Sequence, residues 1–313
     1  MSNLTRIALS SLPRDIEFSE NGDTLLMKMD QACTTANMQE NSAAFEAWAL
    51  YGRTAGYKSV ILSESIWTRE ISNAEKLHYH RFLYRVSCFI RGFEWFTVSD
   101  ELRMKADEFE NTELSRDDLY VNAPIIEAAS ETESPEAKME RLLVSDEYRE
   151  FLNKTFGIEV EKYYNQLPVG LFGGRVVSKA AIFPRSHAAI DIWGLSGRTF
   201  HLIELKVKKN QNLGVLSEVF FYACYIYDMY CQKHLERKDP ADLRKYKRQG
   251  AFLRGYPELI NANIDSVVAH ILTEQKHPRL DAALAELRQY KHDDIRFANA
   301  VGHPLSKLTE KPI

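Results

Sequence analysis

The clearest hydrophobic pattern lies in the second half of the chain. Residues 188–193 and 199–208 contain two mostly apolar runs, and the segment 194–198 between them is rich in turn-forming residues. Short apolar runs bounded by such residues are typical of buried strands. The pattern therefore predicts a β-hairpin. A long helix is expected to follow it over roughly 213–235.

A further helix is expected before this hairpin. Ser134 is a good N-cap, Pro135 suits the first helical position, and large apolar residues recur over 135–155. Two short runs, 175–177 and 180–183, are candidate strands. The second half is thus expected to fold in the order helix, hairpin-containing sheet, helix.

The first half shows the pattern of a small α/β domain. Strands are expected at 25–29, 59–62 and 95–98, and helices at 41–55 and 74–91, with Gly92 ending the second helix. The aromatic residues of 78–96 could stack on bases, but their spacing of three and four residues is more typical of a buried core.

The two halves are joined by an acidic stretch. Residues 107–136 hold ten acidic residues and one basic residue, with few large apolar side chains. Such a segment buries little surface and is expected to be a linker or an extended connection. The 313 residues also suit two domains. We place the boundary near 130, with an N-terminal α/β domain of unknown role at 1–130 and a second domain at 131–313.

The composition excludes several classes of protein. Hydrophobic residues make up 45% and charged residues 27% of the chain, which is ordinary for globular proteins and unlike collagen or disordered chains. No run approaches the roughly 18 apolar residues of a membrane span, and the first residues lack the pattern of a signal peptide. We therefore expect a cytoplasmic protein with no membrane partner. Four cysteines without a C-x-x-C pair are expected to be buried and unpaired.

Charge is distributed unevenly around the net value of −4. Residues 1–130 carry 13 basic and 20 acidic side chains, whereas residues 206–254 carry 11 basic and 5 acidic ones. A basic segment beside a site suits a polyanion, although a solvated helix face has the same pattern. The candidate nucleic-acid-binding residues are Lys208, Lys209, Lys233, Arg237, Lys238, Arg244, Lys245, Lys247, Arg248 and Arg254.

Three charged residues interrupt the apolar strands of the hairpin. Glu204 and Lys206 are two positions apart, so they project from the same face of a strand. Hairpin pairing across 194–198 brings Asp191 alongside that strand. The three side chains are therefore expected to lie close together.

This combination points to metal-dependent chemistry. Two neighbouring carboxylates repel each other, and a divalent cation removes that penalty. Oxygen ligands suit Mg²⁺ or Mn²⁺, so Asp191 and Glu204 are the candidate metal ligands. Lys206 could orient or help to deprotonate a water molecule, or stabilise charge at phosphorus. These are the groups that phosphodiester hydrolysis requires.

The sequence resembles the PD-(D/E)XK nuclease superfamily, which has the restriction-endonuclease-like fold. The residues that carry the resemblance are Asp191 for the first acid and Glu204-Leu205-Lys206 for the E-x-K element. Ile190 stands where the signature has Pro. The resemblance covers about a third of the chain, roughly 136–235.

Two flanking helices extend the resemblance. The family commonly has an acid on the helix before the sheet, which implies a catalytic role for Glu140, with Glu136 and Glu147 as alternatives. It often has Gln-x-x-x-Tyr on the following helix, where this chain has Glu218 and Tyr222 as supporting residues. Glu218 could be a further metal ligand or a salt-bridge partner of Lys206 or Lys208.

The resemblance implies a mixed central sheet flanked by helices and a metal-dependent nuclease that cleaves nucleic acid, most readily double-stranded DNA. A role in prokaryotic or phage restriction, defence or repair follows from the resemblance alone, and a homodimer remains open. Two alternatives are a catalytically inactive nucleic-acid-binding module with this fold and an interaction protein in which Asp191, Glu204 and Lys206 form a structural ion-pair cluster.

Overall fold

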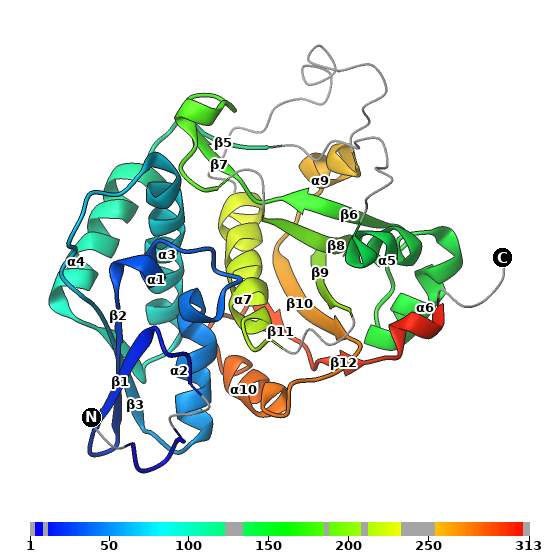
Figure 1. Cartoon of the computed structure of the whole chain (residues 1–313). Coiled ribbons are helices and arrows are strands. Elements are labelled where there is room, and N and C mark those ends of the chain that lie inside the picture. Colours follow the sequence, from blue (N-terminus) through cyan, green and yellow to red (C-terminus); the bar gives the residue numbers. More distant parts are fainter. Residues whose placement is uncertain are drawn as a thin grey trace.

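The computed structural model describes residues 4–8, 12–122, 134–184, 188–207, 212–232 and 254–308. It is a mixed α/β protein in which helices flank several sheets (Figure 1). Within these ranges no helix is long and apolar enough to cross a membrane.

The first half folds around a four-stranded mixed sheet in the order β1-β2-β3-β4. The strands β1 and β2 are antiparallel, and β2, β3 and β4 are parallel. The strands are β1 (Ile16–Asn21), β2 (Thr24–Met29), β3 (Ser59–Glu64) and β4 (Phe96–Val98). The helices are α1 (Gln31–Thr34), α2 (Phe45–Thr54), α3 (Asn73–Gly92) and α4 (Asp100–Phe109). The predicted strands and helices of this half are confirmed to within a few residues, whereas β1, α1 and α4 were not predicted.

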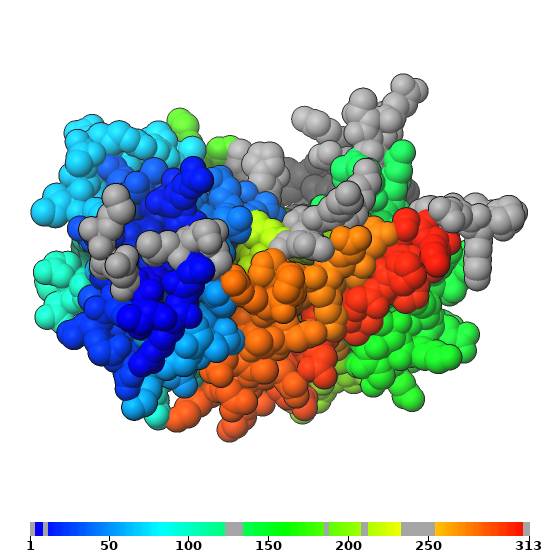
Figure 2. Space-filling view, turned by 60° about the horizontal axis from the view of Figure 1, so that its bottom comes forward, coloured from blue at the N-terminus to red at the C-terminus, as the bar shows by residue number. Residues whose placement is uncertain are grey.

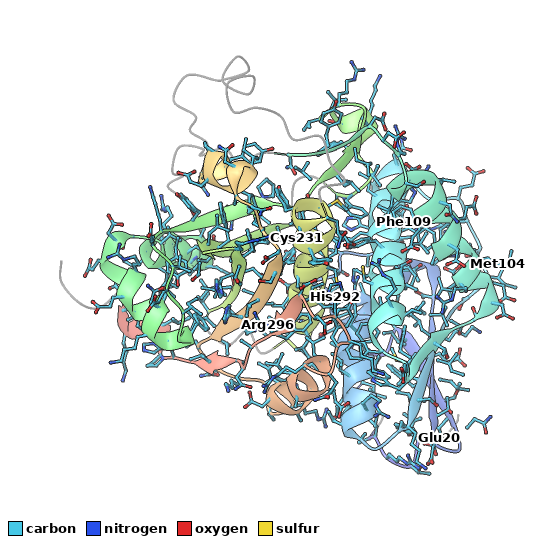
Figure 3. The ribbon with its side chains drawn as sticks, turned by 180° about the vertical axis from the view of Figure 1, so that it is seen from behind. Glu20, Met104, Phe109, Cys231, His292 and Arg296 are labelled. Atoms are coloured by element: carbon cyan, nitrogen blue, oxygen red, sulfur yellow. The ribbon has the colours of Figure 1, made fainter. Side chains whose placement is uncertain are left out.

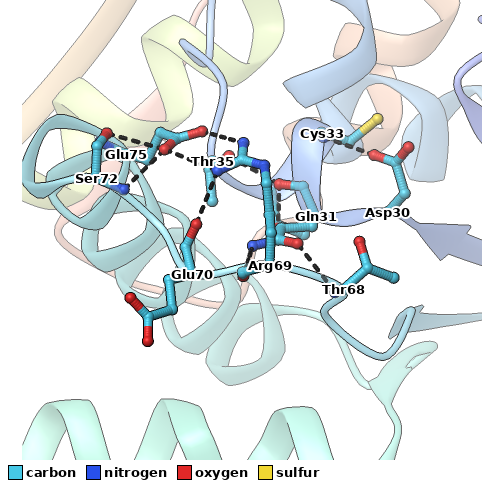
Figure 4. Close-up of polar contacts among 10 residues, drawn as sticks. Asp30, Gln31, Cys33, Thr35, Thr68, Arg69, Glu70, Ser72 and Glu75 are labelled. Carbon is cyan, nitrogen blue, oxygen red and sulfur yellow. Dashed lines mark hydrogen bonds and ion pairs between the residues drawn. The ribbon is translucent and has the colours of Figure 1, made fainter.

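Side chains fix where two of these helices begin (Figure 4). The Asp30 carboxylate accepts a hydrogen bond from the backbone N–H of Cys33 at the start of α1. Ser72 and Glu75 form a reciprocal capping box at the start of α3, and Arg69 pairs with Glu75. Because these caps satisfy backbone N–H groups that lack helical partners, they determine the first residue of each helix.

The second half contains a six-stranded mixed sheet in the order β11-β10-β9-β8-β6, with β12 also paired to β10. The strands β8 and β9 form the predicted antiparallel hairpin, and β10 runs parallel to β9. Its strands are β6 (Tyr163–Pro168), β8 (Ala189–Ser196), β9 (Thr199–Lys206), β10 (Ser266–Thr273), β11 (Ile295–Phe297) and β12 (Val301–Gly302). Its helices are α5 (Pro135–Leu143), α6 (Asp146–Phe156), α7 (Val215–Ile226), α9 (Tyr256–Asn261) and α10 (Leu280–Leu287).

The hairpin turn is shorter than the pattern predicted. Residues 194–196 remain in β8, so only Gly197 and Arg198 connect the two strands. Gly197 has a φ of +58°, a conformation that glycine adopts without a steric penalty. A two-residue turn of this kind fixes the register of β8 against β9.

The prediction that residues 107–136 form a linker is wrong over its first part. The helix α4 continues to Phe109, a π-helical turn covers Glu110–Leu114, and β5 (Leu119–Val121) pairs with β7 (Leu171–Gly173). Although the segment is acidic, Phe109, Leu119 and Val121 are buried. A few apolar anchors therefore order a chain whose average composition suggests a linker.

Four other predicted elements differ from the structure. The helix expected over 135–155 is two helices, α5 and α6. The runs 175–177 and 180–183 are not strands, because Ser178–Ala180 forms a 3-10 turn and Ala181 makes a single bridge to Phe172. The described part of the helix expected over 213–235, which ends at residue 232, is α7 followed by a π-helical turn at Tyr227–Cys231.

Alternate residues of the hairpin strands face two different layers. Ile192, Ile203 and Leu205 pack with residues of α5 and α6 in one core cluster. Trp193 and Leu202 belong to a second cluster that also contains the apolar residues of α7. Glu204 and Lys206 lie two and four residues after Leu202, on the same face of β9, so they face α7. The predicted alternation along β9 is confirmed.

The second core cluster runs through both halves of the chain. It contains Phe45 and Phe89 of the first half together with Phe220 of α7, and the rings of Phe89 and Phe220 lie 5.1 Å apart. The helix α10 packs against α2, and the two halves meet along a continuous surface in Figure 2. The predicted boundary near 130 falls within 123–133, outside the described residues. The aromatic side chains Phe82, Phe89 and Phe96 are buried. The cysteines form no disulfide with one another; Cys33, Cys88 and Cys224 are buried as expected, whereas Cys231 is only partly buried, which corrects the expectation for that residue.

Candidate functional site

The end of the hairpin positions two carboxylates side by side. Ile192 and Ile203 are the pair of β8 and β9 residues farthest from the hairpin turn. The next positions away from the turn are Asp191 on β8 and Glu204 on β9. Beyond this point the Asp191 Oδ2 atom accepts a hydrogen bond of 2.8 Å from the backbone N–H of Leu205. The carboxylate thus takes the place of a ladder partner and is held beside Glu204.

Lys206 joins β9 to α7. Its Nζ donates to Glu204 Oε1 at 2.7 Å and to Glu218 Oε2 at 3.0 Å. Tyr222 lies one helical turn after Glu218, and its buried hydroxyl has no hydrogen-bond partner among the described residues. The structure therefore brings together Asp191, Glu204 and Lys206 from the hairpin with both residues that the sequence suggested on the following helix.

The helix α5 adds a second pair of acids. Glu140 is buried, and its Oε2 accepts a hydrogen bond of 2.6 Å from Gln166 Nε2. Burial and the charge of Asp191 raise the pKa of this carboxyl, whereas the side chains of Gln166 and Asn165 lower it. Glu136, one turn earlier, is partly buried, and its Oε1 has no partner among the described residues. Glu147, the third acid considered from the sequence, is exposed on α6.

Gln166 has the one left-handed backbone conformation found for a non-glycine residue in the described ranges, with a φ of +58°. Its neighbours Asn165 and Leu167 pair with Ile192 and Ile190, so Gln166 lies opposite Asp191 but is not itself paired. A non-glycine residue in this region costs about 1–3 kcal/mol. The strain occurs at the strand position that holds Glu140 beside Asp191.

This strain gives a testable difference between two substitutions. Both Gln166→Gly and Gln166→Ala remove the hydrogen bond to Glu140, but only glycine relieves the backbone strain. We expect the glycine variant to be more stable than the alanine variant by about 1–2 kcal/mol in urea unfolding. In an ordinary strand position alanine would be favoured instead, by about 0.5–1 kcal/mol. An alanine variant that is more stable than the glycine variant would contradict a strained backbone at Gln166.

The first half of the chain also reaches this site. Gln39 Nε2 donates to Glu218 Oε2 at 3.4 Å, a contact between residues 179 positions apart. The buried guanidinium of Arg81 is held by Asn37 Oδ1 at 2.9 Å and interacts electrostatically with Glu218 and Tyr222. No pattern in the sequence indicated either residue, because Gln39, between α1 and α2, and Arg81, on α3, are both far along the chain from Glu218.

Burial and mutual repulsion keep several of these acids in their neutral form. Burial, followed by the charge of Asp191, raises the pKa of Glu140 to about 8. Burial raises the pKa of Asp191 to about 7, against the opposing effects of Lys206 and the Leu205 N–H. Burial and Asp191 together raise the pKa of Glu204 well above its ordinary value. The cluster thus holds more acidic groups than one lysine can neutralise.

The remaining two charges are stable as an ion pair. Burial disfavours the charged form of Lys206, but Glu204 and Glu218 outweigh it and raise the lysine pKa. Burial likewise opposes ionisation of Glu218, yet Lys206 and hydrogen bonds from Glu204, Lys206 and Gln39 lower its pKa. Of the two acids that Lys206 contacts, Glu218 therefore ionises more readily than Glu204.

The raised pKa of Glu140 predicts that stability depends on pH. Between its ordinary value, about 4.3, and about 8, the unfolded chain has released a proton that the folded chain keeps. The free energy of unfolding should therefore fall as pH rises through this window, by up to about 1.4 kcal/mol per pH unit for this group. Urea unfolding at pH 5, 6, 7 and 8 measures the slope.

Glu140→Gln should reduce this slope, whereas the exposed Glu147→Gln should leave it unchanged. An identical slope in Glu140→Gln and the parent protein would show that Glu140 ionises normally in the folded state.

The donor set fits a magnesium or manganese ion that keeps part of its hydration shell. No three His, Cys, Asp or Glu side chains in the described ranges are arranged to hold a metal ion by themselves. Mg²⁺ in proteins is often held by one or two carboxylates, with waters and substrate phosphates completing the shell. Asp191 and Glu204 can supply two such ligands, and the buried Glu204 Oε2 has no partner among the described residues.

Most of the predicted nucleic-acid-binding residues lie outside the described residues. These are Lys208, Lys209, Lys233, Arg237, Lys238, Arg244, Lys245, Lys247 and Arg248. Arg254 is described, and its Nη1 donates to the backbone carbonyl of Asn165 at 3.5 Å. This contact places one basic residue next to the strand segment that carries Gln166.

Comparisons of this chain with models of protein families, with curated proteins and with solved structures found no match.

Proposed function

We propose that this protein is a metal-dependent nuclease, with Mg²⁺ or Mn²⁺ as its cofactor and double-stranded DNA as its most suitable substrate. The observation that carries the proposal is the buried cluster of Asp191, Glu204 and Glu218 around a single lysine, with the buried Glu140 next to Asp191. Acids so close together do not stabilise a fold by themselves, because each raises the free energy needed to ionise its neighbours. Binding of a cation removes this repulsion.

Each residue has a role in phosphodiester hydrolysis. Asp191 and Glu204 would hold the cation, and Glu140, on which the charge of Asp191 acts, would bind a water of that ion or the attacking water. When bound, the cation supplies Lewis-acid stabilisation of the charge that develops on the phosphate. Lys206 donates hydrogen bonds and stabilises developing negative charge; its raised pKa favours this role over that of a base. Gln166 and Glu218 position Glu140 and Lys206.

The arrangement of elements supports a restriction-endonuclease-like fold for the second half. Asp191 and Glu204 lie on strands of a mixed sheet that has α5 and α6 on one face and α7 on the other, and these helices carry Glu140 and Glu218. We propose that the first half completes the site through Gln39 and Arg81, in addition to a role in recognition or dimerisation. A cytoplasmic role in restriction, defence or repair is part of this proposal.

Cleavage of supercoiled plasmid by the full-length protein tests the function. We expect nicked and linear products with Mg²⁺ or Mn²⁺ and none with EDTA, and a structured RNA in parallel distinguishes DNA from RNA as substrate. Salt-sensitive DNA binding without cleavage would instead support the inactive binding module. Neither binding nor cleavage with any divalent cation would favour the structural ion-pair cluster.

A further inference from the structure

A second polar cluster lies at the opposite end of β9 from the acids. His201 of β9 and His270 of β10 are both buried, and His201 Nδ1 lies 3.1 Å from His270 Nε2. His201 lies on the same face of β9 as Ile203 and Leu205, so it faces the α6 layer rather than α7. This cluster is therefore separated from Glu204 and Lys206 by the sheet itself.

The two histidines line a cavity of about 380 Å³, a size within the usual range for small-molecule sites. Phe156, Ile158 and Phe297 form apolar parts of its wall. Arg296, on the edge strand β11, also lines the cavity and is labelled in Figure 3. Arg296 is exposed, and its guanidinium has no ion-pair or hydrogen-bond partner among the described residues. The cavity thus combines apolar walls with an uncompensated guanidinium.

The protonation of the histidine pair determines what the cavity offers a ligand. Burial lowers the pKa of His201 to about 4 and that of His270 to about 3, so both rings are neutral at pH 7. The His270 Nδ1 atom is buried and has no partner among the described residues. A buried N–H without an acceptor is rarer than an under-satisfied acceptor. We therefore assign the proton to His270 Nε2, which donates to His201 Nδ1.

With this assignment, the remaining nitrogen of His201 is an N–H donor. Arg296 and His201 then both offer the cavity hydrogen-bond donors. His201 donates through this N–H group, and a guanidinium has donors but no acceptor. Such a pair is complementary to the oxygens of a carboxylate or phosphate, and arginine binds these groups in a bidentate manner. Neutral histidines beside an unpaired cation leave a net positive charge for an anion to compensate.

We propose that this cavity binds a small organic anion. Its carboxylate or phosphate oxygens accept hydrogen bonds from Arg296 and His201 Nε2, and its apolar or aromatic part packs against Phe156, Ile158 and Phe297. The proposal does not depend on the nuclease function, because it involves none of the acids around Lys206 and lies on the other face of the sheet.

Calorimetric titration and thermal unfolding of the full-length protein test the site with defined probes. Adenosine 5′-monophosphate and benzoate are the anionic probes, adenosine and benzyl alcohol are their neutral counterparts, and inorganic phosphate tests the oxyanion alone. Sodium chloride keeps the ionic strength constant. We expect the two organic anions to bind and to raise the melting temperature, their neutral counterparts to bind at least tenfold more weakly, and inorganic phosphate to bind more weakly than either organic anion.

Arg296→Gln should weaken binding of the organic anions at least about tenfold, because a hydrogen bond to a charged group contributes about 1.5–3 kcal/mol. The exposed Arg288→Gln of the same region, whose guanidinium bonds Asn299, is the matched control and should bind as the parent does. The unchanged melting temperature of probe-free Arg296→Gln verifies that the variant folds.

Three results would overturn the proposal. The first is that neither organic anion binds at 10 mM. The second is that the parent and Arg296→Gln bind the organic anions equally tightly, and the third is that the anions and their neutral counterparts bind the parent equally tightly. If inorganic phosphate binds as tightly as the organic anions, the site recognises an oxyanion alone, and the proposed packing on the apolar wall is wrong.

Discussion

Replacing Glu204 by glutamine is expected to lower cation-dependent DNA cleavage by at least roughly 10²–10³-fold, the usual effect of removing one preorganised electrostatic contact. The free energy of unfolding of the metal-free protein should stay the same or rise. Glutamine has nearly the same shape, keeps an oxygen for Lys206, and removes the repulsion that Glu204 feels from Asp191 and Glu218. Plasmid nicking and urea unfolding of the same preparation measure both quantities.

The exposed Glu147→Gln is the matched control, since it removes one negative charge without touching the cluster. Asp191→Asn should behave as Glu204→Gln does, because it removes the other proposed metal ligand. A loss of stability in Glu204→Gln, together with no cation-dependent cleavage by the parent protein, would identify the cluster as structural and would contradict the nuclease proposal.

The second large effect is expected from Lys206→Met. The Nζ atom of this buried lysine is within 3.0 Å of both Glu204 and Glu218. Removing one partner from a buried ion pair typically costs about 3–5 kcal/mol, because the remaining charge is left without compensation. We expect a loss of this size in urea unfolding at pH 8 and a smaller one at pH 5, where Glu218 can take up a proton. Cleavage should also be strongly reduced.

A double substitution separates the ion pair from general packing effects. Lys206→Met with Glu218→Gln should recover part of the lost stability, since both buried charges are then absent. The exposed Lys154→Met on α6 controls for the loss of one positive charge. No recovery in the double variant would show that the cost of Lys206→Met arises from packing of the lysine stem.

The central part of the site could be predicted from local sequence because it depends on strand geometry. Glu204 and Lys206 share a face through the two-residue period of β9, and Asp191 is brought to them by a hairpin whose turn lies only a few residues away. Neither inference requires knowledge of distant segments. The same holds for α3, whose boundaries are set by its own capping box and by Gly92.

Elements whose stability depends on the rest of the protein were not predicted. The acidic segment after Asp107 is ordered because Phe109, Leu119 and Val121 find buried partners elsewhere in the chain. Composition averages over a segment, whereas burial depends on a few side chains and on what lies opposite them.

Only the tertiary structure identified the groups that support the acids. Gln166 takes a strained conformation opposite Asp191, Gln39 bonds Glu218 across 179 positions of the chain, and Arg81 lies behind Glu218 and Tyr222. The sequence by itself determined which charges share a strand face, since that follows from backbone periodicity. Whether those charges are buried, which of them keep a proton and which distant residues hold them depend on the packing of α3, α5 and α7 around the sheet, because desolvation and proximity are properties of the assembled fold.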